Sequence, residues 1–332
     1  MLKKVLIFFT LAIIVLFTQC SSDEQKIMPG MTGKIGEVVT VVDNPLWQSA
    51  IGDTLAALLQ SPYPGLPVDE PRFSLVHIPN SALNNIFKTH RNILIINVSS
   101  HFEKAQVLIN KSVYSDGQLF ININAPEQNS CINLLKEQGE YIVEYIEKTE
   151  RERNISYYTR YKDREIIAKI KQQFNCDIII PSGYEIAKIK DDDNFMWIST
   201  ETPLATQGIF IYQYDYTDTN TFTISYLVNK RDEFLKKHVE SETPGSYMKT
   251  ATIYPPDIRA FEHKGDYTCE LRGLWEVEND FLGGPFISFS KIDKQRNKVI
   301  TVEGFVFAPS QDKRNYVRQL EAILYTFDVA DN

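Results

Sequence analysis

The sequence predicts an α+β protein in which antiparallel or mixed sheets are combined with helices. Short runs rich in β-branched and aromatic residues, typical of strands, alternate with longer runs that have apolar residues at helical spacing. In addition, residues 73–124 align with residues 175–226 at a constant offset of 102 and without a gap. Together these observations favour a chain built from βαβββα-like repeats, two of them clear and a third more divergent.

The first expected strand is "EVVTVV" at 37–42. Asn44 and Pro45 then supply a helix N-cap followed by proline at the first helical position. Apolar residues recur at helical spacing after them, which predicts an amphipathic helix over 45–60. The segment "SPYPGLPVDEP" at 61–71 ends this helix, because its prolines cannot continue one.

The two aligned segments share an order of elements. Each has a strand ("FSLVHIP", "CDIIIP"), a short helix or turn, a second strand ("NILIINV", "NFMWIST") and a hairpin with the turn "YSDGQ" or "YTDTN". The alignment holds nine identities, where about three are expected from average residue usage. They include the pairs Pro79/Pro181, Asn92/Asn194 and Asp116/Asp218. With closing helices expected near 128–150 and 229–240, the pattern predicts an internal duplication.

A third, divergent copy is expected over 247–330. Its strands would be "MKTATIYPP" and "CELRGLWEV", its hairpin "FISFSKIDKQRNKVITVEGFVFAP". The closing helix has one apolar face: Tyr316, Leu320, Ile323, Leu324 and Phe327. Because small repeats cannot bury their own apolar faces, they stack on neighbours. We therefore expect units at 37–174, 175–246 and 247–330 that pack as one compact body over 37–330.

The N-terminus predicts an export signal. Lys3 and Lys4 precede an apolar run from Val5 to Phe17, which is broken only by Thr10. That run is too short to cross a bilayer, which needs about 20 apolar residues, and has the length of a signal-peptide core. An ordinary A-x-A cleavage site is missing.

The apolar run ends close to Cys20, and the junction resembles a bacterial lipoprotein signal, in which the cysteine is lipidated. Phe17 and Gln19 depart from the usual residues of that box, and a buried structural cysteine is the alternative. We expect a signal peptide at 1–19 and a flexible stalk at 20–36 that joins the lipid to the fold. The protein would then reside in the cell envelope, lipid-anchored to the outer membrane on its periplasmic or its surface face.

Composition restricts the partners. The formal net charge is −8, and an acidic surface argues against nucleic acid as a partner. Cys131, Cys176 and Cys269 lie far apart, without the C-x-x-C or histidine spacing of a zinc site. Buried free thiols are expected, although one pair could form. No cofactor and no metal are predicted, and no local catalytic motif occurs.

The segment "LWEVENDFLGGPF" at 274–286 is the strongest candidate site. Along a strand, Trp275 and Val277 would face one side, and Glu276 and Glu278 the other. One interpretation is an exposed acidic strand edge. The other is a polar concave site in which aromatic rings stack on a hydroxylated ligand and carboxylates hydrogen-bond to it. The candidate binding residues of this segment are Trp275, Glu276, Glu278, Asn279, Asp280, Phe281, Gly283 and Gly284.

Loops that follow the second strand of each copy would complete this site. They span 99–106, 201–207 and 278–285, and equivalent loops of stacked repeats tend to fall on one face. We therefore expect the three loops to border one groove. The first two loops would contribute His101, Glu201 and Gln207 to it.

Several stretches carry a resemblance to a known family: "GKIGEVVTVVDNPLW", "SPYPGLPVDEPRF", "KTHRNIL", "LRGLWEVENDFLGGPF" and "DKRNYVRQLEAILY". They resemble a Bacteroidota lipoprotein family, the domain of unknown function 4837, over nearly the whole mature chain. The resemblance implies an envelope lipoprotein and no particular activity.

Two functional hypotheses follow. The first is a non-catalytic envelope module that binds a glycan, a peptide or an envelope protein. The second is a glycan-directed hydrolase that uses two carboxylates among Glu276, Glu278 and Asp280, since paired carboxylates at a suitable separation hydrolyse glycosidic bonds. Carboxyls that face each other across a cleft would favour the enzyme, and outward, solvated carboxylates would favour the binding module.

Overall fold

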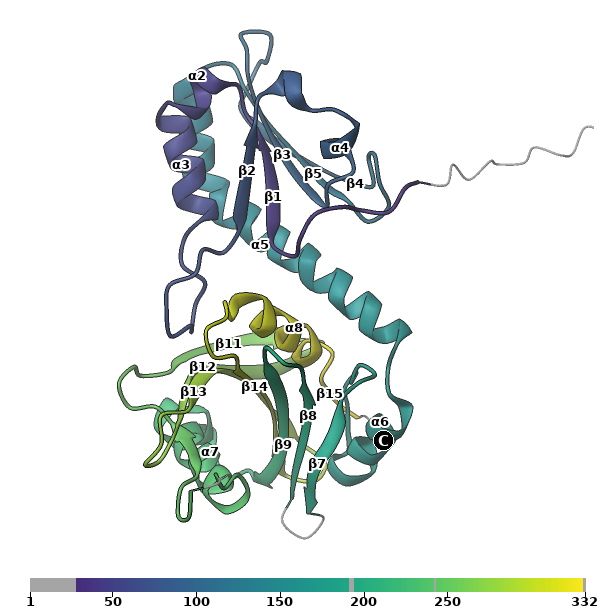
Figure 1. The fold of residues 1–332 in the computed structure, drawn as a ribbon, viewed down its shortest axis with the longest axis vertical. Helices are drawn as coiled ribbons and strands as arrows, with labels where there is room; N and C mark the ends of the chain where they lie inside the picture. Colours follow the sequence, from purple (N-terminus) through teal and green to yellow (C-terminus); the bar gives the residue numbers. More distant parts are fainter. Residues whose placement is uncertain (1–27, 191–193, 242, 331–332) are drawn as a thin grey trace, which may run out of the picture.

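The computed structural model describes residues 28–190, 194–241 and 243–330. The chain forms two lobes, each built from one main sheet and its helices (Figure 1). The first sheet is mixed and the second is antiparallel, so the predicted α+β class is confirmed. The predicted signal peptide, Cys20 and most of the stalk lie outside the described residues.

The upper lobe in Figure 1 holds a five-stranded sheet of order β2-β1-β3-β5-β4. Neighbouring strands pair in parallel except β4, which runs antiparallel to β5. The strands are β1 (Glu37–Val41), β2 (Ser74–Ile78), β3 (Asn92–Val98), β4 (Gln106–Lys111) and β5 (Leu119–Ala125).

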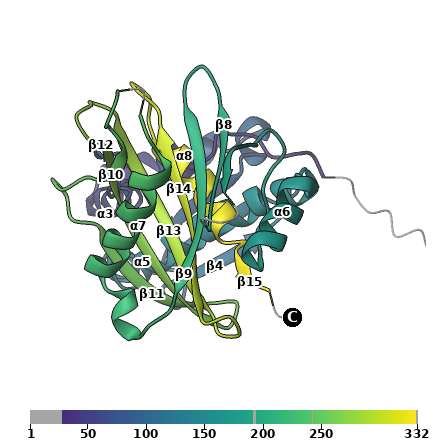
Figure 2. The ribbon, with the colours of Figure 1, turned by 90° about the horizontal axis from the view of Figure 1, so that it is seen from below.

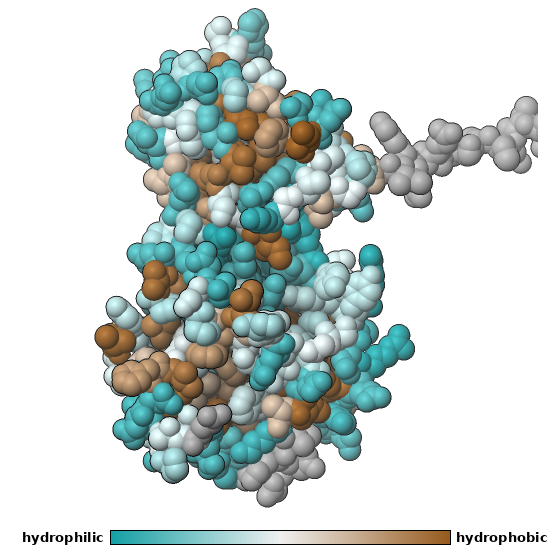
Figure 3. Space-filling view, viewed as in Figure 1, coloured by the Kyte–Doolittle hydropathy of each residue, from teal (hydrophilic) through white to brown (hydrophobic). Residues whose placement is uncertain are grey.

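Both faces of this sheet bury apolar side chains. Val38 packs with α3 (Ala50–Leu59) and α5 (Gln128–Arg160), while its neighbour Val39 points to the opposite face. In the described part of the chain, that opposite face packs against a short 3₁₀ turn (Asn80–Ala82) and α4 (Asn85–Lys88). Figure 3 accordingly shows hydrophobic residues gathered on the upper lobe.

Two predicted helices have different bounds in the structure. The helix expected over 45–60 is split into α2 (Asn44–Trp47) and α3, because Ser49 accepts a hydrogen bond from the Ile51 N–H and caps a new helix. The helix expected over 128–150 is α5, which continues to Arg160. At about 1.5 Å per residue, α5 is long enough to run from behind the upper sheet to the lower lobe (Figure 1).

The lower lobe holds a curled antiparallel sheet of order β10-β12-β13-β14-β9-β8-β7, with β11 beside β12 (Figure 2). A separate pair joins β6 to β15. The strands are β6 (Cys176–Asp177), β7 (Glu185–Lys190), β8 (Phe195–Glu201), β9 (Thr206–Asp215), β10 (Met248–Thr250), β11 (Asp257–His263), β12 (Asp266–Val277), β13 (Gly283–Asp293), β14 (Lys298–Phe307) and β15 (Asp328–Val329).

Helices cover both faces of the curled sheet. One face packs on α7 (Ile224–His238), which follows a 3₁₀ turn at Thr219–Phe222. The other face packs on α6 (Arg164–Phe174) and α8 (Arg314–Leu324). The apolar face predicted for α8 is confirmed at Leu320, Ile323 and Leu324, which are fully buried, whereas Tyr316 is partly buried and the buried Phe327 follows the end of the helix.

The structure does not show the predicted repeats. In 73–124 the strands β2 and β3 both pair in parallel with β1, which lies outside the aligned segment. In 175–226 the strands β7, β8 and β9 form an antiparallel meander. Asp116 lies in the β4–β5 hairpin, whereas Asp218 caps the 3₁₀ turn after β9. Identities at strand and turn positions reflect residue preferences that unrelated strand orders share.

The predicted units 175–246 and 247–330 also share one sheet, because β14 pairs with β9 along its length. The boundary between the two main sheets lies near the end of α5, not at 174/175. Cys131, Cys176 and Cys269 are buried free thiols, as expected. Among the described residues, no helix has the length and apolar character that crossing a bilayer requires.

Candidate functional site

The predicted loop after α3, residues 61–71, contacts the lower lobe. Its Glu70 carboxylate accepts the backbone N–H groups of Lys313 and Arg314, at 2.6 and 2.9 Å. These are donors at the start of α8 that no intrahelical carbonyl can satisfy, so a side chain of one lobe caps a helix of the other. Arg318 of α8 returns a hydrogen bond to the Arg72 carbonyl at 2.6 Å.

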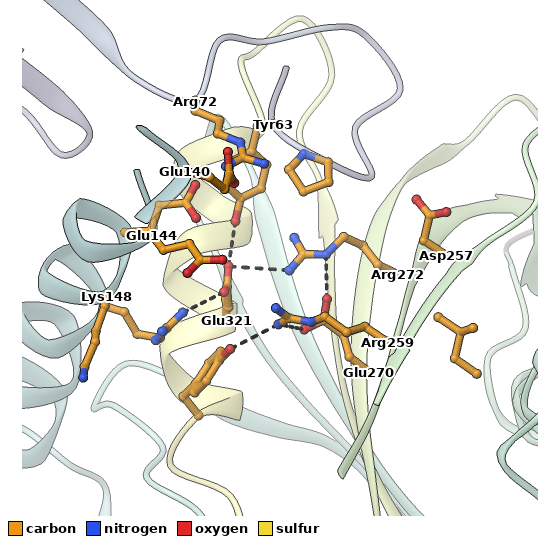
Figure 4. A pocket seen from close by; sticks show the side chains of 15 residues that line it. Tyr63, Arg72, Glu140, Glu144, Lys148, Asp257, Arg259, Glu270, Arg272 and Glu321 are labelled. Atoms are coloured by element: carbon orange, nitrogen blue, oxygen red, sulfur yellow. Dashed lines mark hydrogen bonds and ion pairs between the residues drawn. The ribbon is translucent and has the colours of Figure 1, made fainter. Parts of the chain in front are cut away.

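A charged cluster around Glu321 of α8 lies beside this contact (Figure 4). The Tyr63 hydroxyl donates to Glu321 Oε2 at 2.7 Å, and Arg151 of α5 donates to Oε1 at 3.1 Å. Arg272 of β12 approaches the same carboxylate at 3.7 Å and donates to Glu270 at 3.2 Å. The carboxylate thus joins a loop, α5 and the lower sheet.

The environment sets the ionisation of this cluster. Burial opposes ionisation of Glu321, but Arg272, Arg151 and the Tyr63 hydroxyl outweigh it and hold the pKa of this carboxyl below its ordinary value. Burial, together with the charge of Glu321, raises the pKa of Tyr63, which keeps the hydroxyl protonated as a donor. Burial and the same charge raise the pKa of Glu147. Of the two neighbouring carboxyl groups, Glu321 is therefore the one that ionises more readily.

A cleft of about 450 Å³ opens beside the cluster, between the lobes (Figure 4). Its walls come from the loop after α3, α5, the strands β11 and β12, and α8. The α5 residues recur on one helical face. The lining residues are Tyr63, Pro64, Arg72, Glu140, Glu144, Glu147, Lys148, Arg151, Asp257, Ile258, Arg259, Glu270, Arg272, Glu321 and Tyr325.

Most charges of the cleft are paired. Arg72 contacts Glu140 at 2.7 Å, and Arg259 contacts Glu270 at 2.9 Å. Three buried guanidinium nitrogens nevertheless contact no acceptor in the described part of the chain: Arg72 Nε, Arg272 Nη1 and Arg318 Nη1. A buried donor without an acceptor is unfavourable by roughly 1–3 kcal/mol. Water or a bound ligand can supply the acceptors for these three donors.

The structure places the acidic segment elsewhere. Glu276 and Glu278 both contact Lys249 of the neighbouring strand β10, and their side chains are 36% and 34% exposed. Trp275 is 4% exposed, packs in the core, and donates from Nε1 to the Val306 carbonyl at 3.2 Å. The predicted alternation along the strand is thus confirmed, but Trp275 is not available to stack on a ligand.

The remaining residues of the segment form the turn between β12 and β13. Asn279 is exposed with φ at +59°, and Asp280 accepts the Phe281 N–H at 2.6 Å. Phe281 is fully exposed. Gly283 and Gly284 begin β13, where a Cβ on Gly284 would lie 2.1 Å from the Val306 carbonyl oxygen. The missing side chain of Gly284 therefore allows β13 and β14 to approach closely.

The three predicted loops do not border one groove. The 201–207 and 278–285 loops lie at the same end of the lower sheet, since Thr206 pairs with Phe307 and Phe305 with Phe286. Glu201 is exposed there, and Gln207 donates to the Tyr316 carbonyl at 3.2 Å. The 99–106 loop lies in the other lobe.

The 99–106 loop follows β3, whose first residue Asn92 contacts Glu150 of α5 at 2.6 Å. A strand of this length spans about 20 Å, so the loop lies at the far end of the upper lobe (Figure 1). His101 is exposed there and hydrogen-bonds with Ser99 at 2.8 Å.

Sequence reasoning missed the interlobe cleft. One signal was present: Glu140, Glu144, Glu147 and Arg151 recur at helical spacing and mark a charged stripe on α5. The segments that face this stripe are distant in sequence, and no local pattern pairs them. Among the described residues, no group of histidine, cysteine and acidic side chains is arranged to hold a metal ion.

Comparisons with family models assign a domain to each lobe. Residues 31–159 match a domain of unknown function, DUF8532, and residues 163–326 match a second one, DUF4837. The two matched regions meet where α5 ends. The resemblance to DUF4837 does not extend over nearly the whole mature chain, because the first lobe matches a different family.

No curated protein matches the chain. Similar solved structures include the Ran-binding protein Mog1p of Saccharomyces cerevisiae, at 11% identity and a TM-score of 0.31, covering 47% of this chain and 91% of that one. LpqN, involved in cell envelope biogenesis of Mycobacterium tuberculosis, matches at 10% identity and a TM-score of 0.29, covering 47% of this chain and 83% of that one. Likenesses this distant carry no functional argument.

Proposed function

We propose that this two-domain chain is a non-catalytic binding module of the cell envelope, and that its interlobe cleft holds a polar, hydroxyl-rich ligand such as a glycan segment. The observation that carries the proposal is the cleft itself, which both lobes line with hydrogen-bonding side chains. A ligand there contacts the upper loop, α5 and the lower sheet together.

The balance of charge favours a neutral ligand. The lining has six carboxylates and five basic side chains, and most of them are engaged in ion pairs, within one lobe or between the two. Paired charges present strong donors and acceptors but little net field, so neither an anion nor a cation gains much on entry. Hydroxyl groups both donate and accept, and therefore complement such a surface.

The accessible polar groups of the cleft are those that a ligand would meet first. Glu144 and Lys148 on α5 and Asp257 on β11 are exposed. The Tyr63 hydroxyl and Glu321 lie deeper, bonded to each other. Binding would therefore begin at the rim.

The alternative hypothesis, a hydrolase, has less support. Glu276 and Glu278 share one ammonium on an open strand surface and do not face a second carboxyl across a cleft. Within the cleft, both oxygens of Glu321 already accept hydrogen bonds, from Tyr63 and Arg151. A carboxylate held this way is poorly placed to attack a substrate.

We also propose that the chain is a lipoprotein tethered to the outer membrane through Cys20, by analogy of the junction at Phe17–Cys20 to lipoprotein signals. Multiple acyl chains provide stable anchoring where one chain would be marginal. Intact-mass spectrometry of the membrane-extracted protein should show an acylated N-terminal cysteine, and globomycin should block its processing. An unlipidated mature protein would contradict the anchor without affecting the cleft.

The test of the cleft is a screen of the purified soluble body, from residue 28 onward, against an array of neutral, acidic and amino-sugar glycans. We expect neutral glycans to be retained. For a retained glycan, Glu144→Gln should weaken binding in calorimetry by about tenfold, the loss expected for one hydrogen bond to a charged group. Glu137→Gln is the matched control, because this exposed acid of α5 does not line the cleft.

Two results would count against the proposal. One is an array on which only charged glycans, or none, are retained. The other is a retained glycan whose affinity Glu144→Gln leaves at the value of the Glu137→Gln control. In either case the cluster around Glu321 would be a joint between lobes and not a binding site.

A further inference from the structure

A second concave surface lies in the lower lobe, apart from the charged cluster. It is a groove of about 740 Å³ between the first turns of α7 and the connection from β10 to β11. We call it the α7 groove. Its lining residues are Phe222, Thr223, Ile224, Ser225, Val228, Asn229, Asp232, Thr250, Ala251, Thr252, Pro255, Pro256 and Ile258.

The walls of the α7 groove are largely apolar, and large apolar side chains also project around it. Ile224 and Ile258 in the lining are 38% and 36% exposed, and the neighbouring Ile253 and Tyr254 are 74% and 58% exposed. Single exposed apolar residues are ordinary on protein surfaces, but a group of them around a groove marks an interaction site.

One charged side chain lies in this apolar setting. Asp232 is the only ionisable acid or base among the described residues that line the groove. Its Oδ1 accepts the Thr250 N–H at 2.8 Å and the Thr250 hydroxyl at 2.7 Å, which fixes the carboxylate in place. The side chain remains 32% exposed.

The neighbouring Arg231 compensates this charge only in part, because it also pairs with a second carboxylate. It is fully buried and donates from Nε and Nη2 to Glu303 at 2.8 to 3.0 Å. Its Nη1 donates to the Thr250 hydroxyl oxygen at 2.9 Å and forms a longer hydrogen bond and ion pair with Asp232 Oδ1 at 3.4 Å. Arg231 is therefore shared between two carboxylates, Glu303 and Asp232, and the three side chains together leave one net negative charge beside the groove.

That charge selects the occupant. A wholly apolar partner would remove water from Asp232 and leave a carboxylate without a full countercharge, which is strongly unfavourable. An anionic partner would add repulsion. A cationic head on an apolar body satisfies both features, because its body covers the apolar walls while its head pairs with the carboxylate.

We propose that the α7 groove is a docking site for a partner protein segment in which a lysine or arginine side chain is flanked by apolar residues. The basic head pairs with Asp232, and the apolar flanks cover Ile224, Val228 and Ile258. The acidic net charge of the chain attracts such a segment at longer range. The groove shares Ile258 with the lining of the interlobe cleft, but the proposal does not depend on the ligand proposed for that cleft.

The test uses three small probes that share one apolar body: hexylammonium, hexanol and hexanoate. Binding to the soluble body is followed by methyl NMR, with the signals of Ile224 and Val228 as reporters, because these two residues line the groove and not the interlobe cleft. We expect hexylammonium to shift these signals with an affinity at least tenfold above that of hexanoate and clearly above that of hexanol. High salt should reduce this preference.

Two variants separate the charge from the apolar walls. Asp232→Asn should remove the difference between the affinities for hexylammonium and hexanol. Glu233→Gln is the control and should keep that difference, because Glu233 is an exposed acid of the same helix outside the groove. Val228→Gln should weaken the binding of all three probes. This substitution leaves the hydrogen bonds between Asp232 and Thr250 in place. The proposal is overturned if no probe shifts the reporters, if hexanol binds as tightly as hexylammonium, or if Asp232→Asn retains the preference.

Discussion

Replacing Glu321 by glutamine should loosen the joint between the lobes and make its stability less dependent on pH. The substitution keeps the shape of the side chain but removes the charge that Arg151 contacts at 3.1 Å and Arg272 at 3.7 Å. Breaking a buried ion pair by removing one partner costs about 3–5 kcal/mol. Arg272 keeps Glu270 and Arg151 is partly solvated, so we expect a loss of about 2–3 kcal/mol at pH 7.

The pH dependence follows from the lowered pKa of Glu321. The folded protein holds this carboxyl ionised below the ordinary value of 4.5, whereas the unfolded chain protonates near that value. The stabilisation is therefore complete above about pH 4.5 and is lost as the pH falls through the folded pKa. Wild type and Glu321→Gln should approach each other in stability at acidic pH.

The assay is urea unfolding followed by tryptophan fluorescence at several pH values between 3 and 7. Trp47 lies in the upper lobe and Trp275 in the lower one, so single-tryptophan versions report each lobe separately. Glu152→Gln is the control, because this exposed acid of α5 pairs only with the exposed Lys111. The reasoning is refuted if Glu321→Gln costs no more than the control, or if the difference from wild type persists unchanged at low pH.

Three further outcomes are expected. Glu147→Gln should leave stability at pH 7 unchanged or slightly higher, since burial and Glu321 raise the pKa of Glu147 and make its ionised form unfavourable in the fold; a marked loss in urea unfolding would contradict this. Burial, aided by nearby lysines, lowers the pKa of His263 from 6.5 to about 4. The unfolded chain therefore takes up the proton first, and the stability of the fold should fall as the pH drops between these values. NMR titration of the imidazole checks the pKa, and the stability of His263→Gln should depend less on pH. Gly284→Ala should destabilise by about 1–3 kcal/mol because the new Cβ meets a backbone carbonyl, whereas Gly30→Ala, with open space around it, should not; equal melting temperatures would count against the packing argument.

The sequence alone specified the elements whose signal is local. The β-branched strand "EVVTVV", the hairpin between β13 and β14, and the apolar face of α8 all appear where the local sequence places them. The burial of Trp275 opposite the exposed Glu276 follows from the alternation of side chains along a strand. Each of these features depends on residues within a few positions of one another, so the chain encodes them directly.

Strand order was decided by the tertiary structure. β1 lies between β2 and β3, and β14 pairs with β9, although many residues separate these partners in the chain. Hydrophobic alternation shows that a strand has a buried face, but any strand with the same alternation is an acceptable neighbour. The regular offset between 73–124 and 175–226 therefore predicted a duplication that the pairing does not show.

The candidate sites depend on the same long-range choices. The interlobe cleft joins Tyr63, Arg151, Arg272 and Glu321 from four separate segments, and the α7 groove places Asp232 beside Thr250 of a neighbouring strand. Each of these residues alone reads as an ordinary surface or core position. They acquire specific partners, and the pKa values of Tyr63 and Glu321 shift, only when folding removes water and brings distant side chains within a few ångströms. The sequence supplied the groups, and the packing of two sheets and a shared helix decided which of them meet.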